Sequence, residues 1–208
     1  MDLTVLYRGP LASCDYDCPY CPFAKRRDTT AQLRADRAAL ERFAHWATHS
    51  EDQLSLLFTP WGEGLVRSWY RRTLTELSHL PHIRRVAIQT NLSCRTDWLT
   101  EADLDTIALW CTYHPGQTPY DRFLAKCRDL AEREVRFSVG VVGLPDTWRR
   151  LDGYAPICPD TSTCGSTPPR ATPTGTARPA SGPRSIPSSR TAVTRTRAPA
   201  CPAAPASP

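Results

Sequence analysis

The sequence predicts an α/β fold in which a parallel sheet carries helices, and three observations support this. Residues 1–155 alternate short apolar runs with amphipathic helical stretches, giving five strand-like segments in succession. No Gly-x-Gly-x-x-Gly follows the first of them, which argues against a doubly wound dinucleotide-binding sheet. Every Trp, Tyr and Phe lies at or before Tyr154, so we expect the hydrophobic core to belong to residues 1–155.

The first half of this region predicts two strands and two helices. An apolar run at 3–7 is typical of a strand, and Asp28 or Thr29 is suited to cap a helix that runs to about residue 49. Residues 54–59 predict a buried second strand, and 65–80 predict a second helix. The inward faces expected for the two helices are Leu40, Phe43, Ala44 and Ala47, and then Leu65, Val66, Trp69, Leu74 and Leu77.

The second half continues the alternation. Residues 86–90 predict the third strand, Thr100 is suited to cap a short helix through residue 107, and 109–113 predict the fourth strand. Pro119 fits the first turn of a further helix, and 135–142 predict the fifth strand. The inward side chains expected in that last helix are Phe123, Leu124, Cys127 and Leu130.

A cluster of three cysteines follows the first strand, in the run Cys14-Asp-Tyr-Asp-Cys18-Pro-Tyr-Cys21-Pro. Three thiolates can hold three irons of a cubane iron–sulfur cluster and leave the fourth iron without a protein ligand. An open metal position can bind a small molecule and is therefore reactive. Prolines at 10, 19 and 22 exclude a continuous helix, so the spacing predicts an irregular metal-binding loop.

The spacing Cys-x3-Cys-x2-Cys, with Tyr20 before the last cysteine, resembles the motif of radical S-adenosylmethionine (SAM) enzymes. This resemblance implies an iron–sulfur protein whose [4Fe-4S] cluster, bound by Cys14, Cys18 and Cys21, cleaves SAM reductively and starts radical chemistry on a substrate. The resemblance does not identify that substrate or a catalytic residue. It also implies a partial (β/α)6 barrel with the cluster loop after the first strand. Here the barrel would be cut after its fifth strand, because the composition changes near residue 155.

The resemblance also implies contacts to SAM at the ends of the strands. Gly62-Glu63 is similar to the family's Gly-Glu motif, which receives the SAM amino group, although the usual paired glycines before Glu are absent. Tyr20 would lie near the adenine. The other positions implied for SAM or substrate are Gln89, Asn91, His114, Gly140 and Val142.

Less specific interpretations remain beside these. The three cysteines suit a zinc-binding interaction module with a fourth ligand from Cys94, Cys111 or His114, although the chain shows no second Cys-x2-Cys pair. A further alternative is a truncated, inactive radical SAM protein that binds no cofactor because its barrel is incomplete. Glu63 also suits an ordinary turn, His114 a structural role, and residues 138–143 a plain buried strand.

Charge and composition limit the partners. Of the net charge of +5, residues 1–155 contribute nothing, with 20 Lys+Arg and 20 Asp+Glu, so we expect no specific nucleic-acid binding. No apolar run is long enough to span a membrane, and no secretory signal is visible. Nine cysteines, three of them clustered, favour metal chemistry in a reducing cytoplasm. Lys25-Arg26-Arg27 is a candidate docking site for an acidic one-electron donor, a flavodoxin or ferredoxin.

Residues 156–208 differ from the rest of the chain. They contain six Arg, one Asp and 12 of the 20 prolines, without any aromatic residue. Such a segment cannot bury a core and is predicted to be disordered. A GC-rich gene translated in a shifted frame gives the same composition, and we favour that interpretation. Cys158, Cys164 and Cys201 are weak candidates for an auxiliary cluster.

Overall fold

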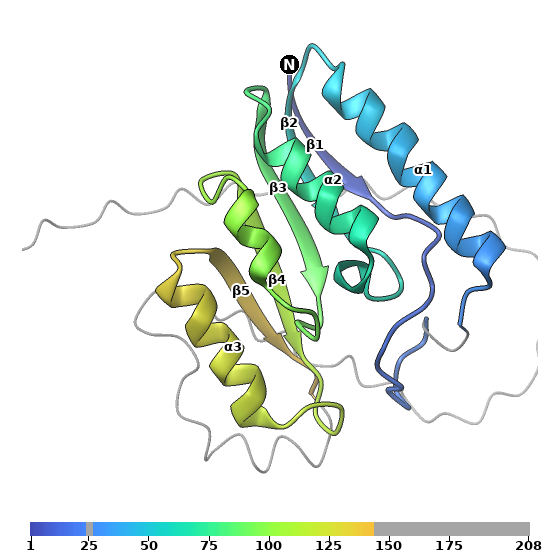
Figure 1. Ribbon diagram of the computed structural model, residues 1–208, viewed down its shortest axis with the longest axis vertical. Helices are drawn as coiled ribbons and strands as arrows, with labels where there is room; N and C mark the ends of the chain where they lie inside the picture. The colour runs from blue at the N-terminus through green and yellow to red at the C-terminus, as the bar shows by residue number, and fades with distance from the viewer. Residues whose placement is uncertain (24–26, 144–208) are drawn as a thin grey trace, which may run out of the picture. The chain divides into compact units, whose positions relative to one another are not determined.

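The computed structural model describes residues 1–23 and 27–143, which belong to one compact unit. They form an α/β fold with a five-stranded parallel sheet, as the sequence predicts, and three α-helices (Figure 1). Lys25, Arg26, the boundary near residue 155 and the predicted disordered segment with its three cysteines lie outside the described residues. The elements in chain order are β1 (Asp2–Tyr7), α1 (Thr30–Thr48), β2 (Gln53–Phe58), α2 (Ser68–Ser78), β3 (Ile83–Thr90), β4 (Ile107–Tyr113), α3 (Tyr120–Glu132) and β5 (Arg136–Val141).

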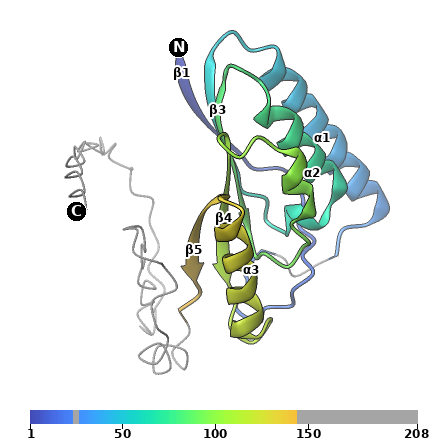
Figure 2. The same cartoon turned by 60° about the vertical axis from the view of Figure 1, so that its left-hand side comes forward.

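The strands lie in the order β1-β2-β3-β4-β5, each parallel to its neighbours, and the sheet is open within the described residues. All three helices cover the same face of this sheet (Figure 2). Because the strands are parallel, their carboxyl ends meet at one edge, where the loop after β1 also begins. In open parallel sheets this edge is where ligands bind.

The helix-covered face holds the core. Alternate residues of the central strands are buried there, among them Leu56, Phe58 and Ile88, and they pack on Leu40, Leu74 and Leu77 of the helices. The opposite face, here called the open face, carries the remaining side chains, including Leu6 and Trp110, which are 58% and 44% exposed. No helix in the described ranges has the length and hydropathy that a membrane span requires.

A buried carboxylate joins the first two helices. Asp36 on α1 is only 1% exposed and accepts hydrogen bonds from Trp69 Nε1 at 2.9 Å and Tyr70 Oη at 3.1 Å on α2. These two donors offset the cost of removing the carboxylate from water. The sequence pattern did not indicate this polar contact, because hydrophobic periodicity predicts only apolar inward positions.

Three local predictions were wrong. The second helix does not start at residue 65: a 3₁₀ turn at Gly64–Val66 precedes α2, because the Glu63 side chain accepts from Leu65 N and caps the turn. The short helix after Thr100 is instead a 3₁₀ turn at Asp97–Glu101, and Asp103 then accepts from Asp105 N and Thr106 Oγ1 in a turn that leads into β4. The third difference is that Pro119 precedes α3 rather than lying in its first turn.

The start of α1 confirms one of the two caps predicted for it. Thr29 accepts a hydrogen bond from Gln32 N, while the Gln32 side chain returns to Thr29 N at 2.8 Å, which together form a capping box. Asp28, the alternative cap, instead accepts hydrogen bonds from the backbone of residues 11–21, the segment that carries the three cysteines and is here called the cysteine loop.

Candidate metal centre

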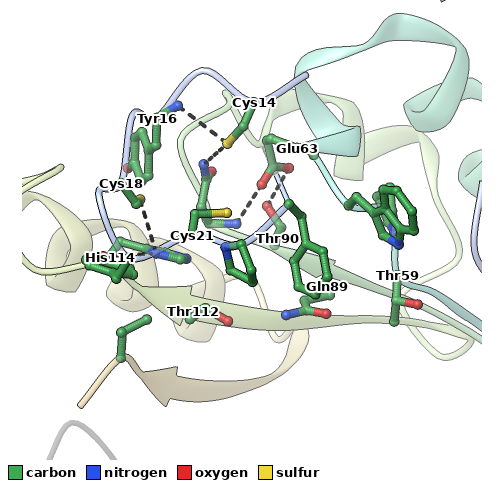
Figure 3. Close-up of a pocket in the computed structure, with 18 of the residues that line it drawn as sticks. Cys14, Tyr16, Cys18, Cys21, Thr59, Glu63, Gln89, Thr90, Thr112 and His114 are labelled. Atoms are coloured by element: carbon green, nitrogen blue, oxygen red, sulfur yellow. Dashed lines mark hydrogen bonds between the residues drawn. The ribbon is translucent and has the colours of Figure 1, made fainter. Parts of the chain in front are cut away.

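The three clustered cysteines line one pocket at the carboxyl edge of the sheet (Figure 3). Its cavity volume is about 280 Å³, close to the lower end of the range typical of small-molecule sites. The predicted site residues that also line it are Tyr20, Gly62, Glu63, Gln89, Asn91, His114 and Val142. Gly140 does not: a Cβ atom placed there would face Trp110 Nε1 at 3.5 Å and Thr112 Oγ1 at 3.9 Å.

The first part of the cysteine loop is held by backbone contacts on two sides. Gly62 N donates to Leu11 O at 2.9 Å, and Glu63 N donates to Ser13 O at 3.1 Å. On the other side, Asp28 Oδ2 accepts from the backbone N–H groups of residues 12 and 13 at 2.9 and 2.8 Å, and Asp28 N donates to Ser13 Oγ. The loop therefore enters the pocket in one fixed direction.

Gly62 is required by this close approach. A Cβ atom at this position would lie 2.0 Å from Ser13 O and 2.5 Å from Ser13 C, which no side chain tolerates. The glycine of the Gly62-Glu63 pair thus has a structural reason that does not depend on any ligand.

The second part of the loop is held by a residue that follows β4. Gln117, in the turn after β4, accepts from Asp17 N at 2.8 Å through its Oε1 atom. The backbone of Cys21 then donates to Cys18 O at 3.0 Å, which folds the last two cysteines into one turn. Sequence reasoning did not find Gln117, because a single polar residue 100 positions away in the chain carries no local pattern.

Cys14 lies in a partly buried environment with hydrogen-bond donors around its sulfur. Tyr16 N lies 3.4 Å from the Sγ atom, and Asn91 Nδ2 lies 3.7 Å from it and 3.1 Å from Asp15 Oδ1. Burial raises the pKa of the Cys14 thiol to about 12, so without a cation the thiol stays protonated at neutral pH. A bound metal would displace that proton, because a coordinating thiol is deprotonated.

Cys18 is buried and lies beside a histidine from the end of β4. His114 Nδ1 is 3.6 Å from Cys18 Sγ and 3.3 Å from Tyr20 Oη, and the Tyr20 and His114 rings are stacked with an angle of 6° between their planes. Burial lowers the pKa of His114, so its ring is mainly neutral at pH 7. A neutral imidazole leaves one ring nitrogen available as an acceptor or metal ligand.

The donor set suits an iron–sulfur cluster. Three thiols surround the pocket, and N–H groups point at Cys14 Sγ, as donors do at the sulfurs of iron–sulfur sites. Within residues 1–23 and 27–143, no three His, Cys, Asp or Glu side chains are grouped so that they could hold a single metal ion. A cubane cluster would place the three thiolates on three different irons.

Glu63 is the buried acid of the pocket. It is 3% exposed, and its Oε1 accepts from Leu65 N at 3.0 Å and Thr90 Oγ1 at 2.9 Å, while Oε2 accepts from Asn91 N at 2.6 Å. Desolvation outweighs these hydrogen bonds and raises the pKa of Glu63 to about 7. The carboxylate therefore joins the segment after β2 to the end of β3 and already accepts three hydrogen bonds from the chain.

The raised pKa of Glu63 predicts a pH dependence of stability. The unfolded carboxyl has a pKa near 4.5 and the folded one near 7, so the folded state retains the proton that the unfolded state loses. The free energy of unfolding should be greatest below pH 4.5 and fall by about 3 kcal/mol towards pH 7, at about 1.4 kcal/mol per pH unit. Urea unfolding of metal-free protein from pH 4.5 to 8 measures this slope. In Glu63→Gln the slope should decrease by the contribution of this carboxyl, and an unchanged slope would contradict the prediction.

Several residues that line the pocket were not predicted from the sequence. Phe23 and Trp61 stack at its mouth with ring centroids 5.8 Å apart. Arg8 and Thr59 line it from the ends of β1 and β2. Their position directly after apolar strands is the one signal that points to them.

Comparison with models of known protein families gives no match, and comparison with curated proteins gives none either.

Proposed function

We propose that this chain is a radical SAM protein that binds a [4Fe-4S] cluster through Cys14, Cys18 and Cys21. The observation that carries the proposal is the pocket itself: three cysteines spaced Cys-x3-Cys-x2-Cys line it together with Tyr20 and the Gly62-Glu63 pair. The loop follows β1 of a parallel sheet covered by helices on one face, which is compatible with a partial (β/α)6 barrel whose interior is the open face.

When bound, the cluster would supply the electron that cleaves SAM. The remaining functions belong to the chain: Tyr16 N and Asn91 Nδ2 donate towards Cys14 Sγ, and the Tyr20–His114 stack forms one wall of the pocket. Because the Glu63 carboxylate is buried and already accepts three hydrogen bonds from the chain, the backbone carbonyls near Gly62 and Glu63 are the better acceptors for the SAM amino group.

The associated proposals follow from this chemistry. A one-electron donor of the flavodoxin or ferredoxin type must reach the pocket. Arg27, the described member of the basic run, is exposed and available for such a contact. A cytoplasmic location fits the need for reduced thiols.

One contact favours a second candidate function. His114 Nδ1 lies 3.6 Å from Cys18 Sγ, so the three cysteines and His114 are the ligand types of a Cys3His zinc site. Of the fourth ligands predicted for zinc, Cys94 and Cys111 do not line the pocket, whereas His114 does. The zinc-binding module therefore has one named ligand set. Zinc binding would have to draw these four side chains together, because no three of them are grouped around a single ion position within residues 1–23 and 27–143.

Metal and sulfide analysis tests the proposal. Anaerobic reconstitution should yield about four irons and four acid-labile sulfides per chain, with an EPR signal on reduction that changes when SAM is added. Reduction in the presence of SAM should release 5′-deoxyadenosine slowly without substrate. Stoichiometric zinc without sulfide would refute the proposal, and an intact cluster that never cleaves SAM would identify the inactive form.

A further inference from the structure

Three polar side chains lie side by side on the open face, where β1, β2 and β3 approach their carboxyl ends. Tyr7 pairs with Phe58 and Phe58 with Ile88, so the next residues along, Arg8, Thr59 and Gln89, form one row across the three strands. Thr59 N donates to Tyr7 O at 2.9 Å, so the backbone hydrogen bonding between β1 and β2 continues to this row. All three residues line the pocket of the cysteine loop.

The hydroxyl in the middle of this row lacks a partner. Thr59 is 5% exposed, and its Oγ1 atom meets no hydrogen-bond donor or acceptor among the residues that the structure describes. A buried polar atom without a partner is costly, and such atoms in a pocket commonly serve a ligand. Arg8, beside it, takes part in no ion pair within the described part of the chain.

We propose that Arg8, Thr59 and Gln89 bind an oxyanion of the substrate, a carboxylate or a phosphate, which makes the substrate class anionic. That the anion belongs to a substrate rests on the proposed function. That these three residues bind an anion does not. A guanidinium, a hydroxyl and an amide N–H are the donors that such a group accepts, and Arg supplies two parallel bonds.

The charges around the row agree with this assignment. Glu63 is the one carboxylate that lines the pocket among the described residues, and its oxygens point to Leu65, Thr90 and Asn91 rather than to the row. Among the described residues that line the pocket, Arg8 is thus the basic side chain beside the row, and Glu63, the acid there, is bonded elsewhere.

The chain offers a matched control for the test. Arg85 pairs with Ser55 on the same strands and is exposed on the open face four residues before Gln89, about 13 Å away along β3. Arg85→Gln removes the same charge from the same face without touching the row.

The experiment is an NMR titration of the ¹⁵N-labelled full chain with sodium phosphate and, separately, sodium acetate, at ionic strength held constant with NaCl. The amide signals of Thr59 and Gln89 should shift in a saturable way, and the anion that binds more tightly identifies the substrate group. Arg8→Gln should weaken binding by about tenfold or more, and Arg85→Gln should leave it unchanged. Thr59→Val should weaken binding several-fold without lowering Tm, because the hydroxyl has no partner to lose.

Three results would overturn the inference: equal effects of Arg8→Gln and Arg85→Gln, a lower Tm of Thr59→Val with binding retained, or displacement of the anion by SAM. The last would assign the row to the SAM carboxylate. Anion binding without an iron–sulfur cluster would refute the proposed function alone, while a cluster that cleaves SAM in a chain that binds no anion would refute this inference alone.

Discussion

Replacement of Cys14, Cys18 or Cys21 by Ala is expected to abolish binding of the proposed iron–sulfur cluster. In the proposed cluster each thiolate would hold a different iron, so two thiolates would leave two irons without protein ligands and the cluster would be lost. Iron and sulfide per chain should fall from about four each to near zero, with loss of the EPR signal and of 5′-deoxyadenosine formation. Iron and sulfide assays of the three variants measure this.

Two matched controls come from the core. Cys94 and Cys127 are buried but do not line the pocket, so Cys94→Ala and Cys127→Ala should retain the cluster and lose only about 1 kcal/mol of stability. His114→Ala separates the two metal hypotheses, because a cubane retains its iron in this variant whereas a Cys3His zinc site loses its metal. Full iron content in any one of the three loop variants would refute the assigned ligand set.

Gly62→Ala is expected to displace the cysteine loop without changing any chemical group in the pocket. The added Cβ would meet Ser13 O at 2.0 Å, and relief of this clash must break the bond from Gly62 N to Leu11 O or that from Glu63 N to Ser13 O. The free energy of unfolding should fall by about 3 kcal/mol. The yield of reconstituted cluster should fall with it, because the loop that carries the three thiols would be displaced.

Gly140→Ala is the matched control for this substitution. Among the described residues, its Cβ would meet Trp110 and Thr112 at ordinary van der Waals distances of 3.5 and 3.9 Å. Since Ala restricts the unfolded chain more than Gly, this variant should be as stable as the parent or slightly more stable. Urea unfolding and iron analysis of both variants decide the matter, and a Gly62→Ala variant of normal stability would show that the loop is not fixed as described.

The local chemistry of the chain predicts much of the fold. The five strands, α1 and α3 appear close to where hydrophobic periodicity places them, and Thr29 caps α1 as its side chain predicts. The predicted helices were wrong where a single polar side chain determines the local backbone. Glu63 caps a 3₁₀ turn, and Asp103 forms a turn in place of a short helix. Such side chains act over two or three residues, which is too short for a periodic pattern to reveal.

The candidate site likewise contains residues that the sequence indicates and residues that only the fold brings to it. The spacing of Cys14, Cys18 and Cys21 and the pair Gly62-Glu63 are contiguous in the chain, so the sequence by itself indicates metal chemistry beside a strand end. Their support is not contiguous: Asp28 and Gln117 hold the loop from 15 and 100 residues away.

Only the tertiary structure placed Arg8, Thr59 and Gln89 in one row. Their proximity depends on the register of β1, β2 and β3, which backbone hydrogen bonds between strands establish. The sequence by itself therefore determined the parallel α/β alternation and the thiol spacing, because both depend on neighbours along the chain. Burial of Asp36 and Glu63 and the composition of the pocket were decided by the tertiary structure, because they depend on which strands and helices pack together.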